Sequence, residues 1–233
     1  MLALLTVSSA AVGQSVPVYN IPKLDPVAFK VANMATKPVI EHIQSGAQCP
    51  TLLGQMQLAV TSNLRPGDGT NVGCQYDKTD ESGLTRVTMY IYTYPGINGA
   101  REYQGAKAQI MQRGDASALK VEELSAVGQV CFDALIPHVG KAAMARNTVD
   151  ELEQETNPVS FGTATYNFDV PAGNGQPALK QTSLLSVYQA GKWVVKTRVT
   201  LPGQGKEVAF RACELSGIAT VNQVPLISRK TEA

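Results

Sequence analysis

Two stretches in which apolar side chains recur at every second position, each ending at a Pro-Gly pair, constrain the fold of this 233-residue chain most strongly. They are residues 84–94 and residues 192–201. The apolar members of the two stretches are Val87, Met89, Ile91, Trp193, Val195 and Val199. Successive side chains of a strand point to opposite faces, so this period of two predicts two strands, each with one buried face. Expected partner strands at residues 72–77 and 181–188 would make each of them half of a hairpin.

A helix is expected after each hairpin. Asn98 can cap a helix that runs to about residue 113, and residues 206–219 carry apolar side chains at helical spacing. An isolated hairpin cannot bury its apolar face. The predicted fold class is therefore α+β, with one antiparallel sheet built from two hairpin–helix (ββα) units and helices packed on it. Between the units we expect a strand around residues 130–132, a turn of helix at 148–155 and a strand at 163–170.

Helices are also expected before the sheet. Asp25 can cap a helix with Pro26 at its first position, and Pro38 interrupts that pattern before a further helical turn. Residues 50–64 form the next candidate, because Leu52, Leu53, Met56 and Val60 would share one helical face. The N-terminal region is therefore predicted to be helical.

The start of the chain resembles an export signal. Residues 1–7 are mostly apolar, and residues 8–14 are mostly small. We expect a secreted or periplasmic protein whose mature chain begins near residue 14 or 15; a frayed apolar terminus is the alternative. No later segment contains the ~20 apolar residues of a membrane span. The expected division is a signal-peptide-like segment (1–14), an N-terminal arm and helix (15–48), the α+β domain (49–222) and a C-terminal tail (223–233).

Four cysteines support export. Cys49, Cys74, Cys131 and Cys213 form no CxxC pair, and the chain has two histidines, so disulfides are favoured over zinc. Four cysteines allow three pairings. We favour Cys49–Cys74, which closes a short loop, together with Cys131–Cys213. Four buried thiols in a cytosolic protein remain the alternative.

Charge and motifs exclude several classes of function. The formal net charge is +1 without a basic stripe, which argues against a nucleic-acid partner. The sequence has no GxSxG nucleophile motif and no phosphate-binding glycine loop. His42 and His138 are the two histidines, and a lone histidine is more often structural than catalytic. Residues 77–83 have alternating oxygen ligands that suit calcium, but a polar hairpin turn is the favoured interpretation. We expect no metal and no cofactor.

The candidate binding surface is a tyrosine ladder beside a basic patch. Tyr90, Tyr92 and Tyr94 share one face of their strand, and tyrosine is common in binding surfaces. The favoured alternative is that a helix or the N-terminal arm covers these rings. The basic patch comprises Lys192, Lys196 and Arg198. It suits an acidic partner or an anionic lipid headgroup, although a solvated strand face would explain it equally well.

The order of elements resembles that of small exported envelope proteins of the Mog1/PsbP-like type. The segments that carry the resemblance are residues 49–53, 73–76, 85–95, 96–113 and 126–132, within residues 49–221. The resemblance implies that Cys49, on a helix, faces the strand of Cys74. It also implies a non-catalytic binding or accessory role in the cell envelope, with an envelope protein or a small ligand as partner. The alternative is a hydrolase assembled from His138, Asp133 and a nearby serine.

Overall fold

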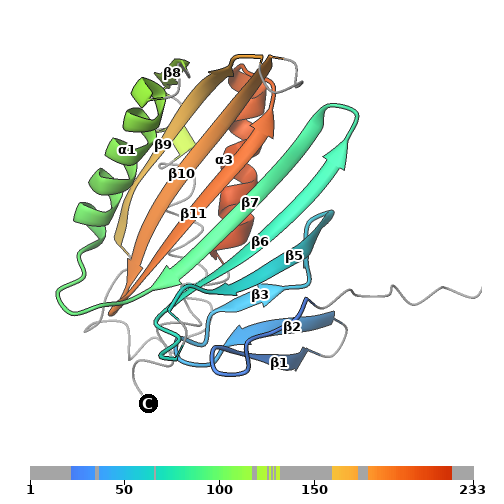
Figure 1. The fold of residues 1–233 in the computed structure, drawn as a ribbon, viewed down its shortest axis with the longest axis vertical. Coiled ribbons are helices and arrows are strands. Elements are labelled where there is room, and N and C mark those ends of the chain that lie inside the picture. Colours follow the sequence, from blue (N-terminus) through green and yellow to red (C-terminus); the bar gives the residue numbers. More distant parts are fainter. Residues whose placement is uncertain are drawn as a thin grey trace, which may run out of the picture.

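The computed structural model describes residues 22–34, 37–65, 67–116, 120–124, 126, 128, 130–131, 159–172 and 178–221. This part of the chain is mostly β, with two antiparallel sheets and two long helices (Figure 1). The expected signal-peptide-like segment, the helical turn at 148–155 and the C-terminal tail lie outside the described residues.

The larger sheet has eight strands in the order β4-β5-β6-β7-β11-β10-β9-β8. The strands are β4 (Leu52–Leu53), β5 (Met56–Asn63), β6 (Asn71–Asp80), β7 (Gly83–Tyr92), β8 (Lys120–Glu123), β9 (Val159–Val170), β10 (Leu179–Ala190) and β11 (Trp193–Pro202). The predicted hairpins are present as β6–β7 and β10–β11. They join through an antiparallel pairing of β7 with β11, in which Ile91 lies opposite Val195.

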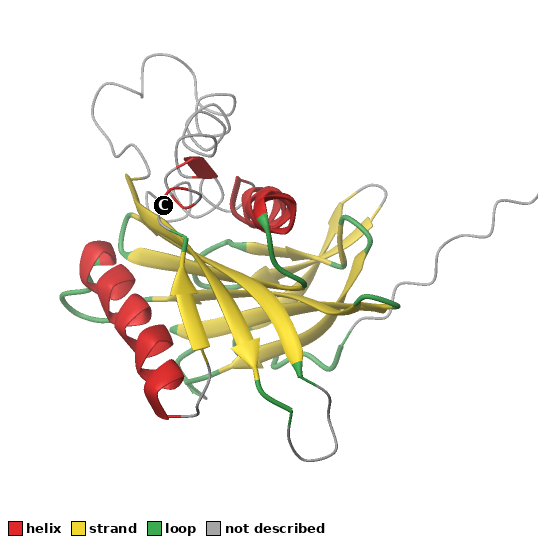
Figure 2. Ribbon diagram, turned by 90° about the horizontal axis from the view of Figure 1, so that it is seen from above, coloured by secondary structure: helices red, strands yellow, loops and turns green. Residues whose placement is uncertain are grey.

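The predicted hairpin–helix units are wrong. Helix α1 (Gly99–Ala116) follows hairpin β6–β7 in sequence but packs against β8, β9 and β10. Helix α3 (Lys206–Val221) lies on the opposite face of the sheet, against β10 and β11 (Figure 2). The face of β6–β7 on the α1 side carries polar residues such as Gln75 and Arg86, whereas Phe168 and Leu185 offer α1 an apolar surface. Burial of that apolar surface therefore places α1 away from the hairpin that precedes it.

The predicted N-terminal helices are also wrong. A three-stranded sheet occupies this region, with β1 (Phe29–Met34), β2 (Lys37–His42) and β3 (Gln48–Pro50). Phe29 lies opposite His42, and Ile40 lies opposite Cys49. Buried Val39 and Ile40 are β-branched, which favours a strand over a helix. Cys49 accordingly lies on a strand, not on the helix that the resemblance implied.

Residues 50–64 form strands for a local reason. Gly54 adopts a φ of 61°, which lets the chain turn between β4 and β5 with Leu53 opposite Met56. After this turn, Met56 and Leu58 are buried while Gln57 between them is exposed. A register shift after Leu58 then disturbs the alternation, so the apolar spacing imitates a helix.

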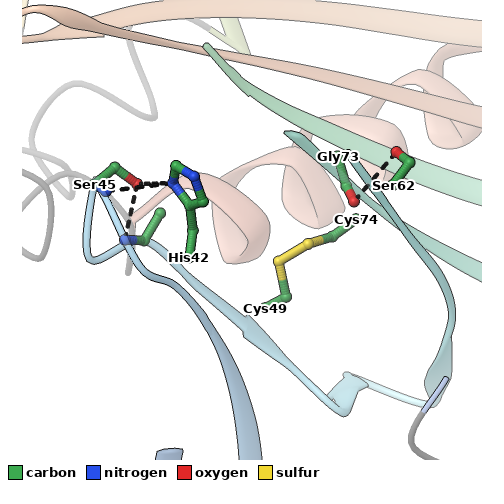
Figure 3. Close-up of a disulfide and its surroundings, with 7 residues drawn as sticks. His42, Ser45, Cys49, Ser62, Gly73 and Cys74 are labelled. Carbon is green, nitrogen blue, oxygen red and sulfur yellow. Dashed lines mark hydrogen bonds between the residues drawn. A yellow bond between two sulfur atoms is a disulfide. The ribbon is translucent and has the colours of Figure 1, made fainter. Parts of the chain in front are cut away.

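Both favoured disulfides are present in the structure. Cys49 of β3 is joined to Cys74 of β6, which links the small sheet to the large one (Figure 3). Cys131 is joined to Cys213 of α3. Residues 130 and 131 are helical, so the strand expected around them is wrong. The two disulfides favour an extracellular or otherwise oxidising environment.

The core has two parts. The larger part lies between the big sheet, the small sheet and α3, and it contains the fully buried Trp193. The smaller part lies under α1 around Tyr166 and Leu185. None of the helices in the described residues, α1 and α3 included, is long and apolar enough to cross a membrane.

A glycine of β9 makes room for α1 and gives a testable prediction. Gly162 has a φ of 137°, and a Cβ there would lie 2.8 Å from ring atoms of Tyr103. The Tyr103 hydroxyl donates to the Thr163 carbonyl oxygen at 3.0 Å. We expect Gly162→Ala to lower the free energy of unfolding by about 2 kcal/mol, because it combines backbone strain with displacement of the ring. Urea denaturation followed by circular dichroism measures this change.

The matched control is Gly105→Ala in α1. Gly105 is exposed, and a Cβ there meets no atom within 4 Å. Alanine should raise the free energy of unfolding by about 0.5–1 kcal/mol, since glycine disfavours a helix interior. Equal effects of the two substitutions would contradict the role assigned to Gly162.

Candidate functional site

The tyrosine ladder is fixed to α1 through one carboxylate. The Tyr92 hydroxyl donates to Glu102 Oε2 at 2.8 Å, and the Tyr94 hydroxyl donates to the other oxygen of the same carboxylate. Burial raises the pKa of Tyr92, and the hydrogen bond to Glu102 adds to this effect. For Tyr94 that hydrogen bond is the main cause of a raised pKa. Both phenols therefore remain donors at neutral pH, and packing under a helix accounts for these two rings.

Lys196 lies opposite Tyr90 on the neighbouring strand. Its ammonium nitrogen is 5.2 Å from the ring centroid of Tyr90 and 5.4 Å from that of Tyr92, a geometry in which aromatic rings attract cations. It forms no ion pair with a carboxylate of the described residues. Burial lowers the pKa of Lys196, although the charge of Glu102 acts in the opposite direction. Lys196 is thus a partly desolvated cation held mainly by aromatic rings.

Arg198 lies two residues further along the same strand face. Its Nε donates to Ser183 Oγ at 3.1 Å, and its Cζ is 5.8 Å from the centroid of the Phe168 ring. Thr88 of β7 is its direct neighbour on the other side. The guanidinium is therefore also positioned by an aromatic ring and a hydroxyl group.

These side chains belong to one surface, which we call the open sheet face. Its members are Arg86, Thr88, Tyr90, Lys196, Arg198 and Thr200, from β7 and β11. Among the described elements, α1 covers β8 to β10 on this side of the sheet, and none crosses β11, β7 and β6 (Figure 1). Arg86 forms a two-pronged salt bridge with Asp77, at 2.8 and 2.9 Å, which also lowers the pKa of Asp77. Lys196, by contrast, forms no salt bridge with a carboxylate in the described part of the chain.

The six predicted surface residues fall in two neighbouring places. Tyr90, Lys196 and Arg198 lie on the open sheet face, and Tyr92 packs between that face and α1. Tyr94 and Lys192 instead line a cavity of about 570 Å³ at the end of the sheet, which we call the end pocket. Glu102 connects the two places, because it binds both Tyr92 and Tyr94.

His42 is a structural residue. It is fully buried, with Nδ1 2.7 Å from Ser45 Oγ and Nε2 2.8 Å from the Gly69 carbonyl oxygen. The Gly69 oxygen can only accept, so Nε2 carries the proton and Nδ1 accepts from Ser45. Ser45 Oγ also accepts the backbone N–H of Ala47 (Figure 3). A serine enclosed in this way cannot reach a substrate, so the His42–Ser45 pair stabilises the loop after β2.

The other candidate sites were the hydrolase residues and the calcium-like turn at residues 77–83. His138 and Asp133, the basis of the hydrolase alternative, lie outside the described residues. The turn between β6 and β7 is a polar hairpin turn, in which the Asp80 carboxylate accepts from the backbone and side chain of Ser82. No cluster of three or more metal-ligating side chains occurs among the described residues.

Sequence reasoning missed Glu102, Phe168 and Arg65, of which Arg65 lines the end pocket. Glu102 had a usable signal, because it lies in the first turn of the helix that follows the tyrosine ladder. Phe168 and Arg65 had none, since their positions depend on how β9 and the loop after β5 are placed in the sheet. Comparison of this chain with protein-family models, with curated proteins and with solved structures found no match.

Proposed function

We propose that this protein is a non-catalytic binding or accessory protein of an oxidising compartment, the secreted or periplasmic space, and that it binds an acidic segment of a partner protein on the open sheet face. One observation carries the proposal: the Lys196 ammonium is held between two tyrosine rings without an ion pair to a described carboxylate. A cation that is already positioned and partly desolvated loses little further freedom when a carboxylate arrives.

Neighbouring groups support the same partner chemistry. Arg198 places a second cation two residues from Lys196, which is the spacing of alternate side chains of an extended acidic segment. Tyr90 offers a flat apolar surface with a polar tip beside both cations. Thr88 lies opposite Arg198, and Thr200 lies opposite Arg86, so both add hydroxyl groups to the same face. Two disulfides favour the oxidising compartment.

Binding of a fluorescent glutamate-rich peptide to the full chain tests the proposal. We expect saturable binding that weakens as salt is added, because the contacts are between charges at the surface. Lys196→Gln should weaken binding about tenfold. Lys30→Gln is the matched control: it removes the same charge from the small sheet, where Lys30 pairs with Glu41, and should leave affinity unchanged.

Two outcomes would overturn the proposal. Equal affinity of the Lys196 and Lys30 variants would show that net charge alone attracts the peptide. Strong binding to anionic lipid vesicles with none to the peptide would assign the face to a membrane surface instead.

A further inference from the structure

The end pocket is built where three connections meet at one end of the large sheet. The connection between β5 and β6 contributes Arg65, Asp68 and Thr70, and the connection between β7 and α1 contributes residues 93–97. Gln189 and Lys192 come from the end of β10 and the β10–β11 turn. Its volume of about 570 Å³ falls within the ~300–1,000 Å³ of pockets that hold small molecules. Sites formed by loops on a rigid sheet are common places for ligands.

Hydrogen bonds between the connections fix the shape of the end pocket. The Thr93 N–H donates to the Thr70 carbonyl oxygen at 2.9 Å, and the Thr93 hydroxyl donates to the Lys192 carbonyl oxygen at 2.6 Å. Gln189 Oε1 accepts the Gly99 N–H at 2.9 Å, which joins the β10–β11 turn to the start of α1. A pocket that is formed before the ligand arrives loses less entropy on binding.

The charges of the end pocket favour an anion. Arg65 and Lys192 are exposed cations without an ion pair to a described carboxylate. Asp68 is the acidic residue of the lining, and its Oδ1 already accepts from the backbone and the hydroxyl of Thr70. Those hydrogen bonds lower the pKa of Asp68, so it stays ionised and partly offsets the cations. Cations still exceed carboxylates by one.

The other side of the end pocket is apolar. Tyr94, Pro95 and Ile97 follow one another closely along the chain and line it together. The hydrogen bond from Tyr94 to Glu102 fixes the phenol, and the Ile97 N–H donates to the Tyr94 carbonyl oxygen at 3.1 Å, which closes the turn. Gly96 has a φ of 74° within this turn, and a Cβ there would meet no atom. The apolar wall is therefore fixed in place and accessible.

We infer that the end pocket binds a small organic carboxylate, with its anionic group between Arg65 and Lys192 and its apolar body against Tyr94 and Ile97. This site is separate from the open sheet face and does not depend on the proposed protein partner. The pocket is open to solvent, so binding of a minimal ligand should be weak and in fast exchange.

Nuclear magnetic resonance titration of the full chain with phenylacetate tests the inference. Phenylacetate carries a carboxylate and a flat apolar ring. We expect the backbone amide signals of Thr70, Thr93 and Lys192 to shift together and to saturate. Arg65→Gln or Lys192→Gln should weaken binding about fivefold or more. Lys30→Gln is the charge-matched control and should bind like the wild type.

Two further ligands separate the parts of the inference. 2-Phenylethanol keeps the ring without the charge, and inorganic phosphate keeps an anion without the ring; both should bind much more weakly than phenylacetate. The inference is overturned if either binds as tightly, if phenylacetate shifts none of the pocket amides, or if the Arg65 and Lys192 variants bind like the wild type. Lys196→Gln should leave phenylacetate binding intact, so this result is independent of the outcome for the acidic peptide.

Discussion

Replacement of Cys131 and Cys213 together by alanine is expected to lower the free energy of unfolding by about 4 kcal/mol. The disulfide joins residues 82 positions apart, so its loss frees a long loop in the unfolded chain and raises the entropy of that state. In the folded state it ties α3 to a helical position that is far away in sequence. Urea denaturation followed by circular dichroism measures the change.

The second disulfide provides the control. Cys49 and Cys74 are 25 positions apart, so the shorter loop predicts a smaller loss of about 3 kcal/mol for Cys49→Ala with Cys74→Ala. Wild-type protein in reductant should lose more stability than either pair of substitutions. If reductant leaves the urea midpoint unchanged, the four sulfurs are not oxidised, and both the disulfides and the oxidising compartment are refuted.

The central strands could be predicted because their two faces differ in chemistry. In β7, buried Val87, Met89 and Ile91 alternate with Thr88 and Tyr90, which remain partly exposed. This alternation is present because one face of the strand packs on the hydrophobic core and the other belongs to the open sheet face. The helices at 99–116 and 206–221 were also found near their expected positions, because turn residues and caps precede them.

The N-terminal strands could not be predicted in the same way. The small sheet packs into the larger core, so Val39 and Ile40 are adjacent and both buried. Strands of this kind lose the alternation that marks a strand in the sequence. Pairing with β3, fixed by the link between Cys49 and Cys74, holds β2 in a sheet that no local pattern indicates.

The chemistry of the candidate site was predicted only in part. Tyr90, Lys196 and Arg198 share a face because β7 and β11 are neighbours, and the predicted single sheet did not specify which strands of the two hairpins would pair. Glu102 reaches Tyr92 and Tyr94 because α1 crosses to the strands of the second hairpin. Long-range placement of this kind depends on which apolar surfaces match, and periodicity within a single segment does not contain that information.

Trp193 gives the second prediction of large effect. It is fully buried and is the one tryptophan of the chain. Its ring packs against the His42 ring in a T-shaped arrangement, with 5.3 Å between the centroids, so it joins the large sheet to the small one. We expect Trp193→Ala to lower the free energy of unfolding by about 4 kcal/mol, because a large cavity forms in the main core. Urea denaturation followed by circular dichroism measures the loss.

Trp193→Phe keeps most of the apolar contact and should lower the free energy of unfolding by less than half as much, so it tests the same contact if the alanine variant does not fold.

His42→Ala then shows whether the contact between Trp193 and His42 joins the two sheets. His42 is held by Ser45 on one side and by the Gly69 carbonyl oxygen on the other, so its ring reaches Trp193 only while the loop after β2 is in place. Removing that ring should let water approach Trp193 and shift its fluorescence to longer wavelength. Unchanged emission in the His42 variant, together with a loss below about 1 kcal/mol in the alanine variant, would show that the small sheet is held without Trp193.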